Sequence, residues 1–132
     1  MLTSVLVIDD DITMTEMLRT VLDPQSFEVF SAHTGEEGIK LTRDLEPDVI
    51  VLDLYMPGMD GWQVCKKIRE FSQVPILVLS ALSKPGTAAR ALDEGADDYL
   101  IKPVPSNILI AHLNTLSRRA RAEKEAAILR DN

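Results

Sequence analysis

Five short apolar runs along the chain alternate with longer segments in which apolar residues recur at helical spacing. A continuous apolar run that stops abruptly is typical of a strand buried on both faces of a sheet. We therefore predict strands near residues 4–9, 27–31, 48–53, 75–80 and 98–101. Strands that alternate with helices predict an α/β fold with a parallel sheet and right-handed crossovers.

The predicted helices have recognisable starts, ends and apolar faces. The first ends at Pro24, because proline cannot continue a helix. Its apolar face consists of Met14, Met17, Leu18, Val21 and Leu22. The second and third helices begin at Thr34 and Asp60, and a Glu or Gln three residues later predicts a capping box at each. The third buries Val64, Cys65 and Ile68. The fourth runs from about Pro85 to Gly95. The fifth contains Leu109, Ile110, Leu113 and Leu116.

The most informative polar residues come directly after the apolar runs. Asp9, Asp10 and Asp11 follow the first predicted strand, and Asp53 ends the third. Because open α/β sheets bind ligands just beyond the carboxyl ends of their strands, we expect these carboxylates to converge in one pocket. Neighbouring carboxylates disfavour one another's charged form unless a cation joins them. The pattern therefore predicts a divalent cation, and oxygen ligands favour Mg²⁺ or Ca²⁺.

Two further predicted strands end in residues that complement this acidic site. Ser80 ends the fourth strand, and Lys102 follows the fifth. A metal ion and an ammonium group neutralise phosphoryl oxygens, a hydroxyl donates a hydrogen bond, and a carboxylate can act as nucleophile. The combination indicates a site that handles a phosphoryl group.

Four motifs cover the strand ends. They are Val7-Ile8-Asp9-Asp10-Asp11, Val51-Leu52-Asp53-Leu54-Tyr55-Met56-Pro57-Gly58-Met59-Asp60-Gly61, Val78-Leu79-Ser80-Ala81 and Gly95-Ala96-Asp97-Asp98-Tyr99-Leu100-Ile101-Lys102-Pro103. In this order and spacing the chain resembles the receiver domain of a two-component response regulator, from Val5 to about Leu116. The resemblance implies a doubly wound, flavodoxin-like, five-stranded parallel sheet of order 2-1-3-4-5 with helices on both faces.

The resemblance also implies roles for the acidic residues. Asp53 is the expected phosphoacceptor, which takes a phosphoryl group in a Mg²⁺-dependent reaction. Asp10 is the expected direct Mg²⁺ ligand, Asp9 acts through a water, and the backbone carbonyl of Tyr55 completes the protein ligands. Mn²⁺ is the alternative ion.

Further expected roles concern the response to phosphorylation. Ser80 is expected to bond a phosphoryl oxygen, and Lys102 to form an ion pair with Asp53 or its phosphate. Tyr99 stands where the family keeps a rotating aromatic residue, and the competing interpretation is a half-buried strand tyrosine. Movement of Ser80 and Tyr99 would switch the surface formed by the fourth helix, fifth strand and fifth helix.

Four residues have expected structural or gating roles. Asp11 is predicted to cap the first helix rather than bind metal, and Pro103 is predicted to follow a cis peptide bond. Tyr55 and Leu82, two residues after the acceptor and the hydroxyl, are expected to stand over the pocket mouth. Both are bulky and neither can orient a water, so we expect slow self-dephosphorylation.

The expected partners follow from the same resemblance. A sensor histidine kinase or phosphotransfer protein donates the phosphoryl group, and a downstream effector or fused output domain receives the signal, with transcription as one output. Relatives with DNA-binding outputs dimerise through charged residues on the fourth and fifth helices. Ala88, Ile108 and His112 stand at three of those positions, so we expect at most a weak, more apolar homodimer.

Composition narrows the remaining questions. A length of 132 residues indicates one domain, with a receiver at 1–117 and a helical extension or truncated linker at 118–132. The net charge of −7 argues against direct nucleic-acid binding. We find no segment for membrane insertion or secretion, and the single cysteine, Cys65, fits a reducing cytoplasm. We expect a signalling domain with self-phosphorylation and self-dephosphorylation chemistry, not an enzyme.

Two other interpretations remain open. Asp9-Asp10-Asp11-Ile12-Thr13 also fits the DxDxT element of haloacid dehalogenase-like phosphohydrolases, with Asp9 as nucleophile and Asp11 as acid/base. The chain is short for that fold, and the loop after Asp53 then has no role. A binding module that no longer becomes phosphorylated is the third interpretation, and the complete acidic set with Ser80 and Lys102 argues against it.

Overall fold

The computed structural model describes residues 2–82 and 84–131 as five strands and five α-helices that alternate along the chain. The strands are β1 (Thr3–Ile8), β2 (Phe27–Ala32), β3 (Val49–Leu52), β4 (Ile76–Ser80) and β5 (Asp98–Ile101). The helices are α1 (Ile12–Leu22), α2 (Gly35–Leu45), α3 (Gly61–Arg69), α4 (Pro85–Asp93) and α5 (Ser106–Asp131), and a short 3-10 helix, η1 (Asp23–Gln25), follows α1.

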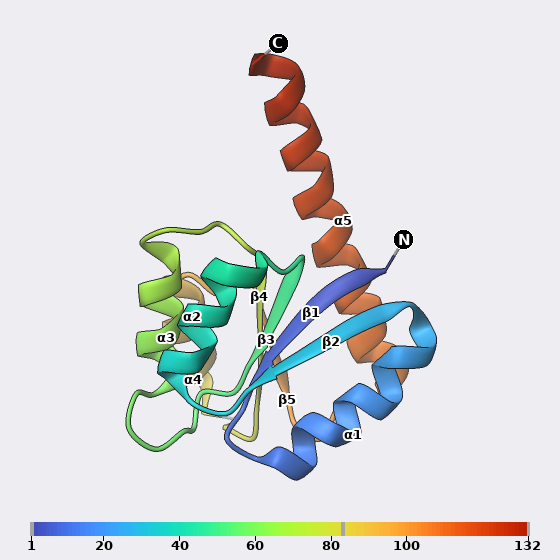
Figure 1. The fold of residues 1–132 in the computed structure, drawn as a ribbon. Coiled ribbons are helices and arrows are strands. Elements are labelled where there is room, and N and C mark those ends of the chain that lie inside the picture. The colour runs from blue at the N-terminus through green and yellow to red at the C-terminus, as the bar shows by residue number, and fades with distance from the viewer. Residues whose placement is uncertain (1, 83, 132) are drawn as a thin grey trace.

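All strand pairs are parallel, and their order is β2-β1-β3-β4-β5. In Figure 1, α1 and α5 cover one face of the sheet, and α2, α3 and α4 cover the other. The doubly wound, flavodoxin-like sheet of order 2-1-3-4-5, with helices on both faces, is therefore confirmed.

Alternate side chains of the central strands pack into two separate cores. Val5 and Val7 of β1 pack with α1 and α5, whereas Leu6 and Ile8 pack with the core under α2, α3 and α4. This alternation is the expected consequence of successive side chains pointing to opposite faces of a strand. Because both faces are covered, β3 and β4 are buried along their whole length.

The apolar face predicted for α1 is partly wrong. Met17 is 52% exposed, while Thr15 is fully buried. Thr15 can occupy a core position because its hydroxyl donates a hydrogen bond to the Ile12 carbonyl at 2.8 Å, which satisfies an otherwise costly buried polar group. Leu18 and Leu22 are buried as expected. The helix ends at Leu22, and Pro24 lies in η1.

One of the two predicted capping boxes is complete. The Asp60 side chain accepts from the Gln63 amide, and the Gln63 side chain accepts from the Asp60 amide. At α2, Thr34 accepts from the Glu37 amide, but the Glu37 carboxylate accepts from the amide of His33. That shift by one residue makes the prediction of a full box at α2 wrong.

The long helix α5 continues without a break through residue 117, the predicted boundary of the receiver, and protrudes beyond the sheet (Figure 1). Arg121 still contacts the body of the domain, with Nη2 donating to Thr3 Oγ1 at 2.8 Å and lying 3.4 Å from Asp48 Oδ2. The division at residue 117 stays a prediction.

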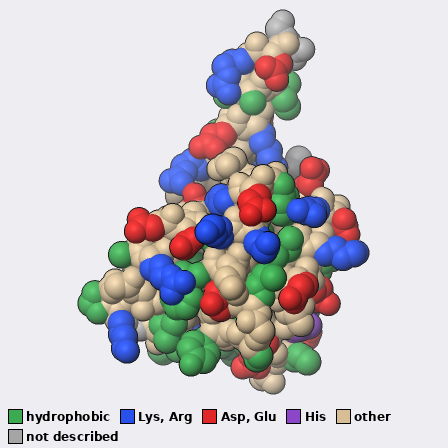
Figure 2. Space-filling model, turned by 90° about the vertical axis from the view of Figure 1, so that its left-hand side faces the viewer, with side chains coloured by type: hydrophobic (Ala, Val, Ile, Leu, Met, Phe, Trp, Pro, Cys, Tyr) green, Lys and Arg blue, Asp and Glu red, His purple; other side chains and the backbone are tan. Residues whose placement is uncertain are grey.

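Charged side chains of both signs are mixed over the side of the molecule seen in Figure 2, and the end of α5 stands clear of it. Such a surface presents no extended field of one sign. Among the described helices, none has both the length and the apolar character needed to cross a bilayer.

Candidate functional site: an acidic cluster at the strand ends

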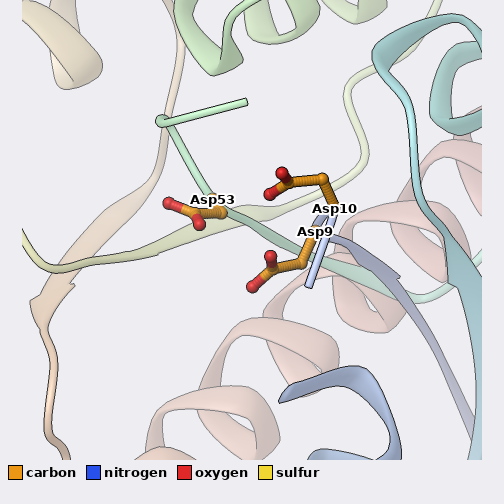
Figure 3. A group of neighbouring side chains, drawn as sticks. All are labelled: Asp9, Asp10 and Asp53. Atoms are coloured by element: carbon orange, nitrogen blue, oxygen red, sulfur yellow. The ribbon is translucent and has the colours of Figure 1, made fainter. Parts of the chain in front are cut away.

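The acidic site forms where two neighbouring strands end. Ile8 of β1 and Leu52 of β3 are partners in the sheet, so the residues that follow them lie side by side. The Asp53 amide donates to the Ile8 carbonyl at 3.0 Å, which fixes the two strand ends together. Asp9, Asp10 and Asp53 each offer an oxygen within 4.8 Å of the others. Figure 3 shows the three carboxylates extending to the same side of the backbone.

The three carboxylates differ in exposure. Asp9 is buried, Asp53 is partly buried, and Asp10 is exposed. Burial raises the pKa of Asp9, and the Asp53 charge acts in the same direction. A hydrogen bond from the Asp11 amide and the charge of Lys102 oppose this rise. A divalent cation bound beside these three carboxylates would stabilise their charged forms. The donor set of carboxylate oxygens therefore fits Mg²⁺.

Lys102 brings the one ammonium group that the described residues place in this cluster. Its Nζ lies 3.3 Å from Asp9 Oδ2 and 3.5 Å from Asp53 Oδ2. Its amide donates to the Ser80 carbonyl at 2.8 Å, which continues the pairing of β4 with β5 past the strand ends. The Lys102–Pro103 bond is cis, as predicted. The expected contact with Asp53 is present, and the shorter contact with Asp9 was not anticipated.

Ser80 and Tyr99 meet at the loop after β4. Ser80 is fully buried, and its Oγ accepts from the Leu82 amide at 3.2 Å. The Tyr99 hydroxyl donates to the Leu82 carbonyl at 2.6 Å. Burial raises the pKa of Tyr99, while a hydrogen bond with Ser80 opposes the rise. Tyr99 therefore reaches the Ser80 loop in the unmodified chain, before any phosphoryl group is present.

The loop after β3 shapes the other side of the site. The Tyr55 amide donates to Asp53 Oδ1 at 3.2 Å, and the Tyr55 side chain is 75% exposed. At the far end of this loop, the Gly61 amide donates to the Leu54 carbonyl at 3.0 Å. A Cβ on Gly61 would lie 2.5 Å from Leu54 Cα and 2.6 Å from the Asp53 carbonyl oxygen. The close approach of the Gly61 backbone to Leu54 and Asp53 thus determines where the Asp53 loop lies. This role of Gly61 was not predicted from the sequence.

Asp11 lies apart from the cluster. It is the N-cap of α1, and its side chain accepts from the Met14 amide at 3.2 Å. The capping prediction is confirmed. The phosphohydrolase interpretation needs Asp9 and Asp11 to act as a pair on one substrate. Instead, Asp9 is buried against Lys102 while Asp11 faces solvent at the helix end.

Two side-chain pairs between elements were not predicted from the sequence. Arg90 of α4 stacks on Trp62 of α3, with Cζ 4.2 Å from the ring centroid. His112 Nδ1 of α5 pairs with Asp98 Oδ2 of β5. Neither pair has a spacing that a local sequence pattern could reveal, because each joins elements that only the fold brings together.

The chain matches the family model for the response regulator receiver domain over residues 5–114. It is 41% identical over 120 residues to the transcriptional regulatory protein AfsQ1 of Streptomyces coelicolor, covering 91% of this chain and 53% of that protein. It is 38% identical to the DNA-binding response regulator MtrA of Mycobacterium tuberculosis, covering 87% of this chain and 50% of that protein. The chain thus spans about half the length of these curated relatives.

Solved structures agree with the sequence comparison. A two-component response regulator from Clostridium difficile superimposes with a TM-score of 0.85 at 33% identity, covering 89% of this chain and 97% of that one. The receiver domain of the Francisella response regulator 1452 does so with a TM-score of 0.84 at 34% identity, covering 89% and 98%. The phosphohydrolase interpretation is therefore wrong. The chain belongs to the response regulator receiver domain family, whose members are signalling domains.

Proposed function

We propose that Asp53 is the phosphoacceptor of this receiver and that a phosphohistidine protein is its donor. The observation that carries the assignment is that Asp53 belongs to the acidic cluster, is only partly buried and lies 3.5 Å from Lys102 Nζ. Asp9 shares Lys102 but is almost fully buried, with only 3% of the residue exposed. Of the two, Asp53 is the carboxylate that an incoming phosphorus can approach.

The transfer exchanges one phosphorus bond for another. An Asp53 carboxylate oxygen attacks phosphorus, the P–N bond to the donor imidazole breaks, and an acyl phosphate forms. Hydrolysis removes the phosphoryl group: a water oxygen bonds to phosphorus, and the P–O bond to Asp53 breaks. Small acyl phosphates can serve as donors in the same step. Lys102 stands close enough to pair with the new phosphoryl oxygens.

Asp10, Asp9 and Asp53, with the Tyr55 carbonyl, would hold the Mg²⁺ that the family implies. Mn²⁺ offers the same preference for oxygen ligands. Bound there, the metal would neutralise charge on the phosphoryl oxygens. Asp10 is the most exposed of the three carboxylates, so it is the one most accessible to a metal ion from solvent. The Tyr55 amide already orients Asp53 through its contact with Oδ1.

Ser80 and Tyr99 couple the acceptor to the α4-β5-α5 surface. A phosphoryl group on Asp53 adds acceptor oxygens that compete for the Ser80 hydroxyl. Ser80 also accepts from the Leu82 amide, and the Leu82 carbonyl accepts from Tyr99. A change at Ser80 therefore alters the loop that holds Tyr99. Because Tyr99 already reaches this loop, phosphorylation shifts an existing equilibrium rather than creating a new conformation.

The surface beside the site suits a helical donor. Ile12 and Met17 of α1 are exposed. An adjacent cavity of about 260 Å³ lies between α1 and the start of α5, next to Lys102 and Pro103. Exposed apolar side chains beside an apolar cavity are typical of a protein-binding surface. A helix of a histidine kinase or phosphotransfer protein could bury these side chains and present its phosphohistidine to Asp53.

We infer that the output surface is formed by α4, β5 and α5. Leu92, Ile101 and Ile108 of the α4-β5-α5 surface are exposed, and His112 pairs with Asp98 within the chain. A weak homodimer through this apolar surface fits these residues better than a charged one. Curated relatives are transcriptional and DNA-binding regulators, so transcription through an output domain is the response we propose.

Mapping the phosphorylated residue tests this function. The chain is incubated with acetyl phosphate and Mg²⁺, the acyl phosphate is trapped by borohydride reduction, and peptides are sequenced by mass spectrometry. We expect the label on Asp53. A label on Asp9 would contradict the assignment of Asp53 as the acceptor, and an unlabelled but folded chain would support a binding module that no longer becomes phosphorylated.

A further inference from the structure

Helix α4 is attached to the domain by few interactions. Ala91 is its one buried residue among those described. Its N-cap, Lys84, makes no side-chain capping bond, and Gly86 in the first turn would have open space around an added Cβ. A helix with so little buried surface changes position at low cost. The contacts that do hold α4 therefore have a large influence on where it sits.

One of these contacts joins α4 to α3. The Arg90 guanidinium lies over the face of Trp62, with Cζ 4.2 Å from the ring centroid. Trp62 is partly buried and packs against the core under α2, α3 and α4. Its buried Nε1–H has no hydrogen-bond partner among the described residues. An unpaired N–H disfavours this position, so ring packing and Arg90 must hold the indole there. We call the Arg90–Trp62 pair the clasp.

The clasp and the Tyr99 switch are connected through α4 and through the core that both contact. Leu82 and Tyr99 pack against the core that Trp62 covers. Leu82, whose carbonyl accepts from Tyr99, lies two residues before Lys84, the N-cap of α4. The position of α4 is thus connected to the acceptor of the Tyr99 hydrogen bond through a very short stretch of chain. The clasp fixes the other end of the same helix.

We propose that Arg90 and Trp62 are positioning residues for the switch, because the clasp holds α4 against α3 in the arrangement that keeps Tyr99 bonded to Leu82. This inference rests on the proposed function, since it assigns a control element to the same site. The clasp residues are not members of the acidic cluster, so the clasp is inferred to act through Leu82 and Tyr99. Loss of the clasp should favour the alternative arrangement, with Tyr99 released from the loop.

The expected effect is modest and measurable. Arg90 is exposed and Trp62 partly buried, and a cation–π pair at an exposed site changes an equilibrium constant by about two- to fivefold. Arg90→Gln removes the charge, whereas Arg90→Lys keeps the charge and loses the planar stacking group. Trp62→Phe keeps an aromatic face and removes the unpaired N–H. We expect the ratio of bonded to released Tyr99 to fall most in Arg90→Gln and less in Arg90→Lys and Trp62→Phe.

The chain provides a matched control. Arg43 of α2 stacks on Phe71 with Cζ 4.3 Å from the ring centroid, away from α4. Arg43→Gln therefore removes a similar cation–π pair without touching the switch. All variants are labelled with 3-fluorotyrosine, which enters only Tyr55 and Tyr99, and Tyr55→Phe assigns the two fluorine signals. The Tyr99 signal reports the population of the bonded arrangement, and urea unfolding reports stability.

We expect the Tyr99 signal to move in the Arg90 and Trp62 variants and to stay at the parent position in Arg43→Gln. Arg90→Gln in a Trp62→Phe background should have a smaller effect than in the parent, because Phe offers Arg90 a weaker aromatic face. Equal shifts in Arg43→Gln and Arg90→Gln would indicate a general loss of stability, and no shift in Arg90→Gln would show that α4 is held by other contacts. Either result overturns the clasp. Phosphate mapping of the parent on Asp53 tests the proposed function separately.

Discussion

Lys102 Nζ lies 3.5 Å from Asp53 Oδ2, although Asp53 follows β3 and Lys102 follows β5, two strands that are not neighbours in the sheet. The same Nζ lies 3.3 Å from Asp9 Oδ2. One ammonium group is therefore shared by two of the three clustered carboxylates, and negative charge remains. Lys102 and a divalent cation compete for the same oxygens, which has consequences for metal affinity and for phosphoryl transfer.

Replacing Lys102 should change Mg²⁺ affinity and the rate of phosphoryl transfer in opposite directions. Lys102→Met removes the competing cation, so we expect Mg²⁺ to bind more tightly, by up to about tenfold for 1.4 kcal/mol. Phosphorylation by acetyl phosphate should slow strongly, because the phosphoryl oxygens lose an ion-pair partner. Titration calorimetry measures the first change and phosphate incorporation the second. Lys66→Met, on the exposed side of α3, should leave both unchanged. Weaker Mg²⁺ binding in Lys102→Met would show that Lys102 organises the site instead of competing for it.

Asp9 should destabilise the metal-free protein at neutral pH. Burial raises its pKa in the folded state, so the folded protein binds this proton more tightly than the unfolded chain. The contribution of Asp9 to the free energy of unfolding therefore falls as pH rises above the ordinary value of about 4 and through the raised pKa. Asp9→Asn removes this dependence and keeps an acceptor for the Asp11 amide.

We therefore expect Asp9→Asn to raise the free energy of unfolding by about 0.5–2 kcal/mol at pH 7 in EDTA. The gain should shrink as pH is lowered toward 4, and added Mg²⁺ should stabilise the parent more than the variant. Urea denaturation across this pH range measures both effects. Asp11→Asn serves as the control, since Asn also caps helices well. A less stable Asp9→Asn variant at pH 7 would mean that the Lys102 contact outweighs burial.

Gly61 should be required for both stability and phosphorylation. Gly61→Ala places a Cβ 2.5 Å from Leu54 Cα and 2.6 Å from the Asp53 carbonyl oxygen, so the backbone that carries the acceptor must move. We expect a loss of about 1–3 kcal/mol in stability and slower phosphorylation of the fraction that remains folded. Gly86→Ala, where nothing lies within 4 Å, should be neutral or slightly stabilising. Equal behaviour of the two variants would contradict the close-approach argument.

The two residues expected to stand over the pocket mouth differ in their exposure to solvent. Tyr55 is 75% exposed, whereas Leu82 is partly buried against the core. We expect Leu82→Ala with Tyr55→Asn to accelerate phosphate loss by about tenfold, which needs a barrier change of only about 1.4 kcal/mol. The decay of purified phosphoprotein at saturating Mg²⁺ measures the rate, and the single variants apportion it. If the double variant decays at the parent rate, Ser80 or Lys102 geometry sets the lifetime.

The strands and the strand-end residues could be predicted because each has a local signal. Val49–Leu52 is a continuous apolar run, and Asp53 ends it abruptly. Sheet topology then forces Asp9 and Asp53 together, whatever the details of the helices. The buried faces of the helices were harder to predict. Thr15 replaced Met17 in the core because a hydroxyl can bond within its own helix, and hydrophobic spacing carries no information about that bond.

Pairs between distant elements could not be predicted. The Arg90–Trp62 stack and the contact between Asp98 and His112 depend on side-chain directions after the helices have packed. The hydrogen bond from Tyr99 to Leu82 depends on the path of the loop after β4. Sequence motifs marked Tyr99 as a switch residue but not its acceptor. Such contacts are where a receiver acquires properties of its own on a shared fold.

The assignment of Asp53 as the acceptor is tested by the intact mass of the chain after incubation with acetyl phosphate, with and without Mg²⁺. We expect the parent to gain one phosphoryl group only when Mg²⁺ is present. Asp53→Asn should gain none while keeping the parent's circular dichroism spectrum, and Asp11→Asn should behave like the parent. A folded Asp53→Asn variant that still gains a Mg²⁺-dependent phosphoryl group would contradict the assignment of Asp53 as the acceptor.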